Sequence, residues 1–478
     1  MKNTNKKSIS ISGVCLILLT VLFGVGLAQA APYTVTNTSD SGAGSLRQAV
    51  IDANAAGSDD VINFSAALSG QSIVLASEIV IANNGTLTIN GLGANVLTIN
   101  GGPGTNRIFY TNLGAIVTIS GVTLTGGGGT GAFSGFGGAI DVIAGSLTLD
   151  RVHITGNTAL NSGGVFFNGG THQISNSTIS SNIATNDCGG LRNFGGTLTV
   201  VNSTISGNST AFTFSGDVGG GICSEGTTTL RSVTITGNTA GEGGGIFHNG
   251  TLNLGNTIVA GNTGVSGNPE IRVQGGTVTS AGYNLIGDNA GDSTNTNISI
   301  TYQPTDIRDV NPLLAQLANN GGATQTHALL FGSPAIDKGN SFTLTTDQRG
   351  FARPVDLAGY TNAAGGNGAD IGAFEAQTAP LAPTAATVSV SGRVITPQGR
   401  GIRNVVVTMT DSNGNTRTAR TTSFGYYRFE EVAAGETYIF TVSGKRFSFE
   451  QNSQVHSIME DTDDINFVAN DQSALQSN

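Results

Sequence analysis

The middle of this chain consists of five copies of one sequence unit, and this repeat constrains the fold more than any other feature. Each copy opens with a Gly-Gly pair and closes with an asparagine. The closing residues are Asn157, Asn182, Asn208, Asn238 and Asn262, spaced 25, 26, 30 and 24 positions apart. A period of this length arises when one supersecondary unit stacks on copies of itself. The sequence therefore predicts a solenoid.

Two aliphatic positions recur in every copy. The position eight residues before the closing asparagine holds Leu149, Ile174, Val200, Leu230 and Leu254. The position three residues before it holds Ile154, Ile179, Ile205, Ile235 and Val259. Equivalent positions stack on one another in a parallel β-helix, so we expect two aliphatic ladders in the interior.

The asparagines and glycines of the repeat have an expected structural role. The closing asparagines should stack as a ladder at a bend, where asparagine tolerates left-handed backbone and its amide can bond the neighbours above and below. The Gly-Gly pairs should supply the turn with positive φ that begins the next strand.

The first thirty residues have the pattern of a secretion signal. Three lysines precede an apolar run, and Ala28-Gln29-Ala30 fits a small-x-small cleavage motif. We therefore expect a secreted or cell-surface protein, cleaved near Ala30, whose mature chain does not insert into a membrane. Without these lysines, 18 basic residues oppose 31 acidic ones. Such an acidic chain is a poor partner for nucleic acid.

Two cysteines remain after the signal, Cys188 and Cys223. Export makes a disulfide possible. However, Cys188 precedes its Gly-Gly pair and Cys223 follows its own by two positions, so the two cysteines occupy different positions of the repeat. We therefore expect two buried free thiols.

The segment 31–72 precedes the clear repeats and contains one amphipathic helix. From Ser45 to Ala55, the apolar residues Leu46, Ala49, Val50 and Ala53 share one face. A helix across the open end of a β-stack shields its exposed core and strand edges. Ser45-Leu46-Arg47 followed by Gln48-Ala49 resembles the CSLREA-type N-terminal region of secreted bacterial β-helix proteins, with Gly44 where that family has cysteine.

The solenoid is expected over 73–300, with roughly nine coils at this period. The repeat resembles right-handed parallel β-helices, in particular the Gly-Gly-aliphatic repeat of polymorphic outer-membrane proteins.

The stretch 301–377 breaks the period and resembles the C-terminal region of the choice-of-anchor Q family. The matching motifs are Asn311-Pro312-Leu313-Leu314, Gly321-Gly322, His327-Ala328-Leu329, Ser333-Pro334-Ala335-Ile336-Asp337, Asp347-Gln348-Arg349-Gly350, Arg353-Pro354 and Asp370-Ile371-Gly372-Ala373-Phe374-Glu375. The resemblance implies a secreted bacterial surface protein, although the tail DQSALQSN carries no familiar sorting signal.

An Ala-, Pro- and Thr-rich linker is expected at 378–387, followed by a block of short strands over 388–470. This block resembles the carboxypeptidase regulatory-like domain through Gly392-Arg393-Val394, Gly401-Ile402-Arg403-Asn404-Val405 and Phe424-Gly425-Tyr426-Tyr427-Arg428-Phe429. The predicted fold is therefore all-β: a right-handed parallel β-helix with an N-terminal cap, followed by a small prealbumin-like β-sandwich.

Paired carboxylates on neighbouring coils would indicate a glycosidase, and a convergent group of acids with a basic residue would indicate a calcium-dependent lyase. In the repeat alignment, Asp150 falls with Ser175, Val201, Arg231 and Gly255, and Asp141 falls with Phe167, Asn193, Cys223 and Phe247. Neither column holds a second acid. The loop acids Asp187, Asp217 and Glu225 remain the only candidate catalytic group, and we interpret them as solvated loop charges.

The remaining polar residues predict no cofactor or metal site. His153, His172 and His248 occupy three different repeat positions, and we interpret each as a surface or turn residue. The acidic run 459–464 is interpreted as a solvated turn rather than a calcium site.

These observations favour a non-catalytic surface or extracellular protein that serves adhesion, carbohydrate contact or envelope structure. Its expected partners are extracellular polysaccharide or cell-surface components. The alternative is a polysaccharide lyase or glycoside hydrolase that uses Asp187, Asp217 and Glu225. A groove lined by aromatics and acids on one face of the shaft would be the most informative observation.

Overall fold

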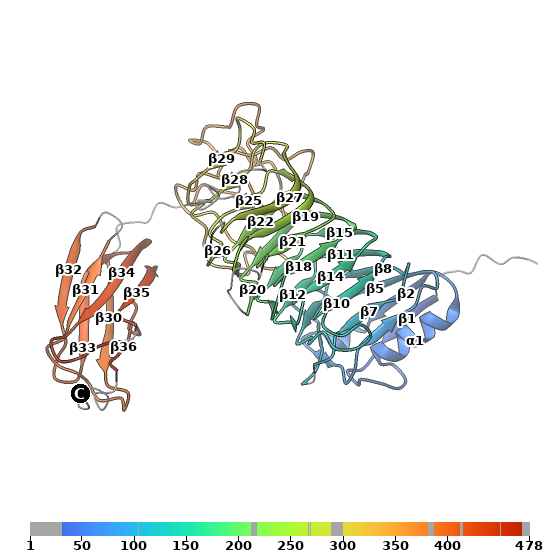
Figure 1. Cartoon of the computed structure of the whole chain (residues 1–478), viewed down its shortest axis with the longest axis horizontal. Helices are drawn as coiled ribbons and strands as arrows, with labels where there is room; N and C mark the ends of the chain where they lie inside the picture. Colours follow the sequence, from blue (N-terminus) through green and yellow to red (C-terminus); the bar gives the residue numbers. More distant parts are fainter. Residues whose placement is uncertain are drawn as a thin grey trace, which may run out of the picture.

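The computed structural model describes residues 31–103, 105–211, 218–265, 267, 269–287, 300–380, 387–411, 414–449 and 451–470. These residues form a long parallel β-helix and a small β-sandwich (Figure 1), which confirms the predicted fold class. The predicted signal (1–30), most of the predicted linker and Asp217 lie outside the described residues.

The β-helix has three faces of parallel strands. Face 1 contains β4 (Ile79–Ile81), β7 (Phe109–Thr111), β10 (Ile140–Ile143), β14 (Val165–Asn168), β18 (Leu191–Phe194), β21 (Ile222–Ser224) and the first residues of β24 (Ile246–Gly255) and β27 (Ile271–Ser280).

Face 2 follows face 1 in each coil. It contains β1 (Ala31–Val35), β2 (Asp60–Phe64), β5 (Thr86–Asn90), β8 (Ile116–Ser120), β11 (Ser146–Asp150), β15 (Thr171–Ser175), the first parts of β19 (Thr197–Ser206) and β22 (Thr227–Thr236), and the last parts of β24 and β27.

Face 3 completes the coil. It contains β3 (Ser72–Val74), β6 (Thr98–Asn100), β9 (Thr123–Thr125), β12 (His153–Thr155), β16 (Thr178–Ser180), the last parts of β19 and β22, β25 (Ile258–Val259), β28 (Leu285–Ile286) and β29 (Ile307–Arg308). A narrow sheet at the next bend contains β13 (Thr158–Ala159), β17 (Ile183–Ala184), β20 (Ser209–Thr210), β23 (Thr239–Ala240) and β26 (Thr263–Gly264).

The N-terminal segment both caps the shaft and contributes to it. Helix α1 (Leu46–Ala56) begins after Ser45, whose side chain accepts the N–H of Gln48, and it buries the four predicted residues Leu46, Ala49, Val50 and Ala53. A single turn, η1 (Ala66–Leu68), follows β2. Strands β1 and β2 already belong to face 2, so the stack begins well before the expected start at residue 73.

The two aliphatic ladders are confirmed. Leu149, Ile174, Val200, Leu230 and Leu254 are in register on face 2, and Ile154, Ile179, Ile205, Ile235 and Val259 are in register on face 3. Every one of these side chains is at most 2% exposed. Stacking of like residues gives each ladder continuous apolar contact along the shaft.

The asparagine ladder is also confirmed. Asn182 Nδ2 donates to Asn208 Oδ1 over 2.9 Å, and the backbone N–H of Asn182 donates to the same oxygen over 3.0 Å. Asn182 Nδ2 also donates to the carbonyl of Ile154. The other rungs repeat this geometry down to Asn262, which donates to Glu270. Each buried amide is thereby satisfied by the adjacent coils.

The backbone at these bends differs from the prediction. Positive φ falls on the residue before each asparagine, Gly156, Ser181, Gly207, Gly237 and Gly261, and not on the asparagine itself. Gly137, Gly219 and Gly243 have the predicted positive φ, whereas the pairs Gly163-Gly164 and Gly189-Gly190 lack it. They must be glycine because the coils approach closely: a Cβ on Gly163 would lie 2.6 Å from the carbonyl oxygen of Gly189.

The prediction of free thiols is wrong, because Cys188 and Cys223 form a disulfide. Cys188 is in register with Gly219 of the next coil, and Cys223 lies four residues further on. In the sequence, the different repeat positions of the two cysteines argued against a bond between them. The bond forms because residue 219 is glycine. A Cβ at that position would collide with the Cys223 sulfur, and its absence leaves the space through which Cys223 reaches back to Cys188.

Residues 309–377 fold back along face 3 and form what we call the cover. The cover contacts a column of outward threonines: Gln348 Oε1 accepts from Thr204 Oγ1 over 2.6 Å, and its Nε2 donates to Thr178 Oγ1 over 2.9 Å. One coil further, Thr234 Oγ1 accepts the N–H of Ala373. Its apolar residues, including Leu329, Ile336 and Ile371, form a second core with Ile258 and Leu285.

The C-terminal domain is a sandwich of two sheets. One sheet has the order β33 (Tyr426–Ala433), β30 (Thr387–Ile395), β36 (Phe467–Val468), and the other has the order β32 (Thr416–Arg420), β31 (Val406–Thr410), β34 (Glu436–Ser443), β35 (Ser453–Ile458). Its core contains Val394, Val407, Phe440 and Phe467, each at most 1% exposed. Asp461 of the acidic run accepts hydrogen bonds from Ser389, so this turn holds the start of β30.

The asparagine ladder predicts a large and local stability effect. Asn208→Ala should destabilise the shaft by about 3 kcal/mol or more, because it leaves the buried amide and backbone N–H of Asn182 without their acceptor. Chemical denaturation followed by circular dichroism measures the shift. Asn186→Ala is the control, because Asn186 is exposed and lies in the same part of the shaft. Equal midpoints for the two variants would contradict the role of the ladder.

The disulfide makes a second prediction. Purified protein without the first thirty residues should show no titratable thiol when denatured without reductant. Replacing both cysteines with alanine should cost about 4 kcal/mol by the chain-entropy estimate for a sequence separation of 35. Reductant should lower the melting temperature of the wild type and leave the double variant unchanged. Two free thiols in the unreduced wild type would refute the assignment.

Candidate functional site

The outside of face 1 carries a column of aromatic and charged side chains. Because side chains alternate along a strand, one outward column runs through Tyr110, Asp141, Phe166, Arg192, Cys223, Phe247 and Arg272. The predicted pairing of Asp141 with Phe167 and Asn193 is wrong by one residue. In the first copy Gly138 and Ala139 take the two glycine positions, which shifts its register.

Four phenylalanines surround a depression of about 460 Å³, which we call the aromatic hollow. The rings of Phe136 and Phe166 stack with centroids 4.7 Å apart, and Phe194 lies 6.3 Å from Phe166. Phe133 and Phe194 are 68% and 47% exposed. Exposed aromatic side chains grouped in a concave site, as here, indicate a binding surface.

Polar groups line the same hollow. The guanidinium of Arg192 lies 5.4 Å from the centroid of Phe194 and 6.0 Å from that of Phe166. Asn161 and Asn168 complete the lining. Within the described chain, the side-chain amide of Asn168 makes no hydrogen bond. The hollow thus combines aromatic faces with donors and acceptors for a polar ligand.

Arg107 positions the edge of the aromatic hollow. Its buried guanidinium donates to the carbonyls of Phe133 and Phe136 over 3.0 and 2.7 Å, and to Glu78 over 2.9 Å. Glu78 in turn accepts the N–H of Ala132. One ion pair therefore fixes the loop that carries two of the four phenylalanines.

Asp141 is a buried acid beneath this hollow. It is 0% exposed, and neither of its oxygens has a hydrogen-bond partner within the described chain. Among the residues that the structure describes, Arg107 is its one ion-pair partner, at 3.5 Å. Burial raises the pKa of Asp141 to about 7, against the opposing effect of Arg107 and with a smaller contribution from Glu78.

A second depression of about 480 Å³, the charged hollow, lies along the same face. Asp187 and Glu225, two of the three candidate catalytic acids, both line it, together with Glu242. Asp217 lies outside the described residues. Arg192, at the edge of the aromatic hollow, pairs with Glu225 over 2.9 Å, so the two hollows adjoin.

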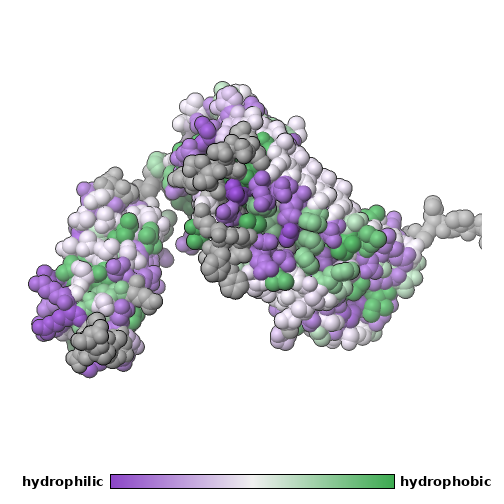
Figure 2. Space-filling model, viewed as in Figure 1, coloured by the Kyte–Doolittle hydropathy of each residue, from purple (hydrophilic) through white to green (hydrophobic). Residues whose placement is uncertain are grey.

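The acids of the charged hollow are engaged. Glu242 accepts from Arg272 Nε over 2.7 Å, and Asp187 accepts the N–H of Val218 over 3.3 Å. Val218 and Phe247 pack on the disulfide, which underlies this part of the face. Figure 2 shows hydrophobic and strongly hydrophilic residues side by side on this part of the shaft.

The Asp150 column has the predicted register and holds no second acid: Asp150, Ser175, Val201, Arg231 and Gly255. The interpretation of the histidines as surface residues is wrong for two of them, because His172 and His248 are 2% and 0% exposed. His172 stands in the inward column of face 2, where Nδ1 accepts from Leu147 and Nε2 donates to Gly169. Burial lowers its pKa and keeps it neutral.

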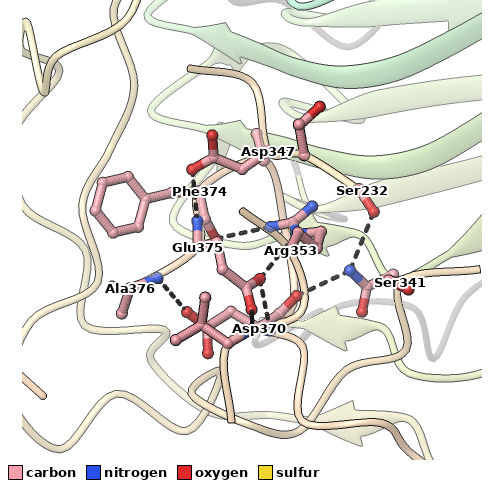
Figure 3. A network of polar contacts seen from close by, with 12 residues as sticks. Ser232, Ser341, Asp347, Arg353, Asp370, Phe374, Glu375 and Ala376 are labelled. Atoms are coloured by element: carbon pink, nitrogen blue, oxygen red, sulfur yellow. Dashed lines mark hydrogen bonds and ion pairs between the residues drawn. The ribbon is translucent and has the colours of Figure 1, made fainter. Parts of the chain in front are cut away.

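The cover contains a third polar cluster, which is closed to ligands (Figure 3). Arg353 pairs with Glu375 over 2.8 Å, and Asp370 accepts the N–H groups of Ala376 and Asp337. Burial and the neighbouring Glu375 raise the pKa of Asp370 to about 8. Both carboxyl groups are 0% exposed. We therefore assign this cluster to the stability of the cover.

Among the described residues we find neither a metal-binding group nor a membrane-spanning helix. In that part of the chain no group of three or more His, Cys, Asp or Glu side chains is placed to bind a metal ion. No helix among the same residues is long and apolar enough to cross a membrane.

The aromatic hollow was missed at the level of sequence. The signal was present, because Phe166, Arg192, Phe247 and Arg272 alternate with inward aliphatic residues in successive copies. The sequence alignment placed the second and third copies one residue out of register with the fourth and fifth, which concealed that these residues share one column. Phe133 and Phe136 come from a loop outside the repeat, and no periodicity points to them.

Comparison with known families decides the nature of the C-terminal domain. The segment 389–470 matches the family described as the carboxypeptidase regulatory-like domain. These residues are a carboxypeptidase regulatory-like domain. The prediction for this segment is therefore confirmed.

Comparisons of the whole chain are less specific. No curated protein matches it. Among solved structures, the pectate lyase Pel9A is similar, with a TM-score of 0.40 and 13% identity over 73% of this chain and 98% of the lyase chain. At that distance the similarity carries no conclusion about activity.

The environment of Asp141 predicts a pH-dependent stability. Its pKa is raised in the folded state, so the folded protein holds this proton more tightly than the unfolded chain, and the stabilisation is lost as pH rises from about 4 to about 7. Asp141→Asn should remove this slope, on the order of 4 kcal/mol across the interval. Unfolding at pH 4 to 8 tests it. Parallel pH profiles for both proteins would contradict the buried acid.

Proposed function

We propose that this protein is a non-catalytic, extracellular glycan-contact protein, and that face 1 of the shaft binds the polysaccharide. The aromatic hollow carries this proposal. Its phenylalanines offer flat apolar faces that suit the C–H surfaces of sugar rings, and two of them are exposed. Arg192 and Asn168 lie beside them to bond hydroxyl or carboxylate groups.

The charged hollow extends this surface along the shaft axis. Asn249 and Gln274 occupy outward positions there, next to the Arg272–Glu242 pair. Adjacent coils are separated by about 4.8 Å, so side chains on successive coils form a ladder of contacts along a line. Such a ladder suits an extended chain of repeated units better than a single small molecule.

Two kinds of observation support export of the protein, as this proposal requires. A disulfide between Cys188 and Cys223 is typical of oxidising compartments outside the cytosol. The Ala28-Gln29-Ala30 motif supports cleavage near Ala30. The Asp347-Gln348-Arg349 and Asp370-to-Glu375 motifs support membership of the choice-of-anchor Q group, and Ser45-Leu46-Arg47 supports the CSLREA-type region. We propose a secreted or surface location on this basis.

The charged hollow favours one alternative, a polysaccharide lyase or glycoside hydrolase. Asp187 and Glu225 lie in one depression, as that alternative requires. Against it, Glu225 and Glu242 are each held by an arginine. A general acid or a nucleophile would have to leave this pairing to act.

The proposal predicts binding that depends on the exposed phenylalanines. We expect the protein to be retained by at least one of immobilised polygalacturonate, alginate and xylan. The double variant Phe133→Ala and Phe194→Ala should bind it about ten-fold more weakly, because two aromatic contacts are lost. Phe331→Ala is the matched control, since Phe331 is 50% exposed but belongs to the cover.

The same samples separate the two functions. Formation of reducing ends or unsaturated products that is lost in Glu225→Gln or Asp187→Asn would establish the enzymatic alternative. Binding that is unchanged in the double phenylalanine variant would remove face 1 from consideration.

A further inference from the structure

The sandwich carries a second depression of a different character. It has a volume of about 1120 Å³ and is lined by Arg403, Arg420, Lys445 and Arg446, together with Asn404 and Phe447. No acidic side chain lines it. We call it the cationic hollow. It contains four of the eight lysines and arginines between residues 387 and 470.

The fold brings these cations together from three segments. Val406 pairs with Arg420 on one side and with Ser443 on the other, so β32, β31 and β34 reach one edge of the sheet at the same rung. Arg403 precedes this rung by three residues. Lys445 and Arg446 follow it at the tip of a tight turn closed by the bond from the Phe447 N–H to the Gly444 carbonyl.

The acidic run 459–464 lies away from the cationic hollow along the sandwich. Ile402, beside Arg403, bonds to Val394 near the end of β30, whereas Asp461 of the acidic run bonds to Ser389 at its start. At about 3.3 Å per strand residue, these points are about 17 Å apart. That exceeds the Debye length of about 8 Å at physiological salt, so this acidic run does not neutralise the hollow.

Three of the cationic side chains of the hollow are available to a ligand. Arg403, Arg420 and Lys445 are exposed, and within the described chain none of the three joins an ion pair. An exposed aromatic residue lies nearby in the chain: Phe424, 71% exposed, is four residues after Arg420, and its carbonyl approaches Gly401. Clustered cations beside an aromatic residue suit a polymer with both charged groups and apolar ring faces.

We propose that the cationic hollow binds an anionic polysaccharide through its carboxylate or phosphate groups. The full chain is acidic, with a formal net charge of −10, so a cluster of cations without acids would direct such a polymer to one end of the sandwich. The concave shape suits an extended polymer rather than a flat lipid surface. This site is separate from face 1, and the protein thereby gains a second attachment point of different chemistry.

The test uses the full protein with and without Arg403→Ser and Lys445→Ser, which are exposed positions. The probes are polygalacturonate for carboxylate, poly(glycerol phosphate) for phosphate, and dextran as a neutral polymer. We expect binding to at least one anionic probe, about ten-fold weaker in the double variant and weakened by salt as screening increases. Any binding to dextran should be the same in the wild type and in the double variant.

The matched control is Arg417→Ser with Arg428→Ser, which removes the same charge from the same domain outside the hollow. Equal losses in both double variants would show that net charge alone is responsible and would overturn the proposal. Absence of binding to both anionic polymers, or stronger binding to anionic lipid vesicles than to either polymer, would also overturn it. Poly(glycerol phosphate) is a probe for the cationic hollow alone, and the Phe133 and Phe194 variant should bind it as the wild type does. Failure of one site is thereby distinguishable from failure of the other.

Discussion

The architecture of this protein depends on the asparagine ladder at the bend after face 3. Each buried amide accepts a backbone N–H and a side-chain N–H from the preceding coil and donates to the following one. A coil that slipped by one residue would leave these groups unsatisfied in the interior, at a cost of several kcal/mol. The ladder therefore fixes the register of all three faces. At the last of these coils it ends on Glu270, which supplies the final acceptor.

Much of the fold was predictable because it depends on periodic positions. The aliphatic ladders, the asparagines and the apolar face of α1 follow from spacing alone. The failures have local causes. The disulfide depends on the absence of a side chain at Gly219. The spacing of the cysteines within the repeat does not show that this space is empty. The buried His172 occupies an apolar column because Leu147 and Gly169 bond both ring nitrogens.

The candidate site was predictable only in part. Asp187 and Glu225 were selected as loop acids, and they do line one depression. The aromatic hollow was not anticipated, since half of its phenylalanines come from a loop held by Arg107 through backbone carbonyls. Hydrogen bonds to backbone carbonyls do not require particular side chains in the loop, so its sequence shows no pattern. The cover adds a further asymmetry: it occupies the threonine column of face 3 and leaves face 1 as the side that carries the hollows.

The cover has a consequence for how the shaft folds. In a simple solenoid each coil touches only its neighbours, and the chain can order itself stepwise from one end. Here Gln348 bonds to Thr178 across 170 positions of sequence, and Arg353 bonds to Asn202 across 151. The coils between Thr178 and Ile258 therefore complete their contacts only after the ribosome has synthesised the chain to about residue 375. This ties half of the shaft into one cooperative unit with high contact order. Its assembly would be slow and would finish only once the cover has been synthesised.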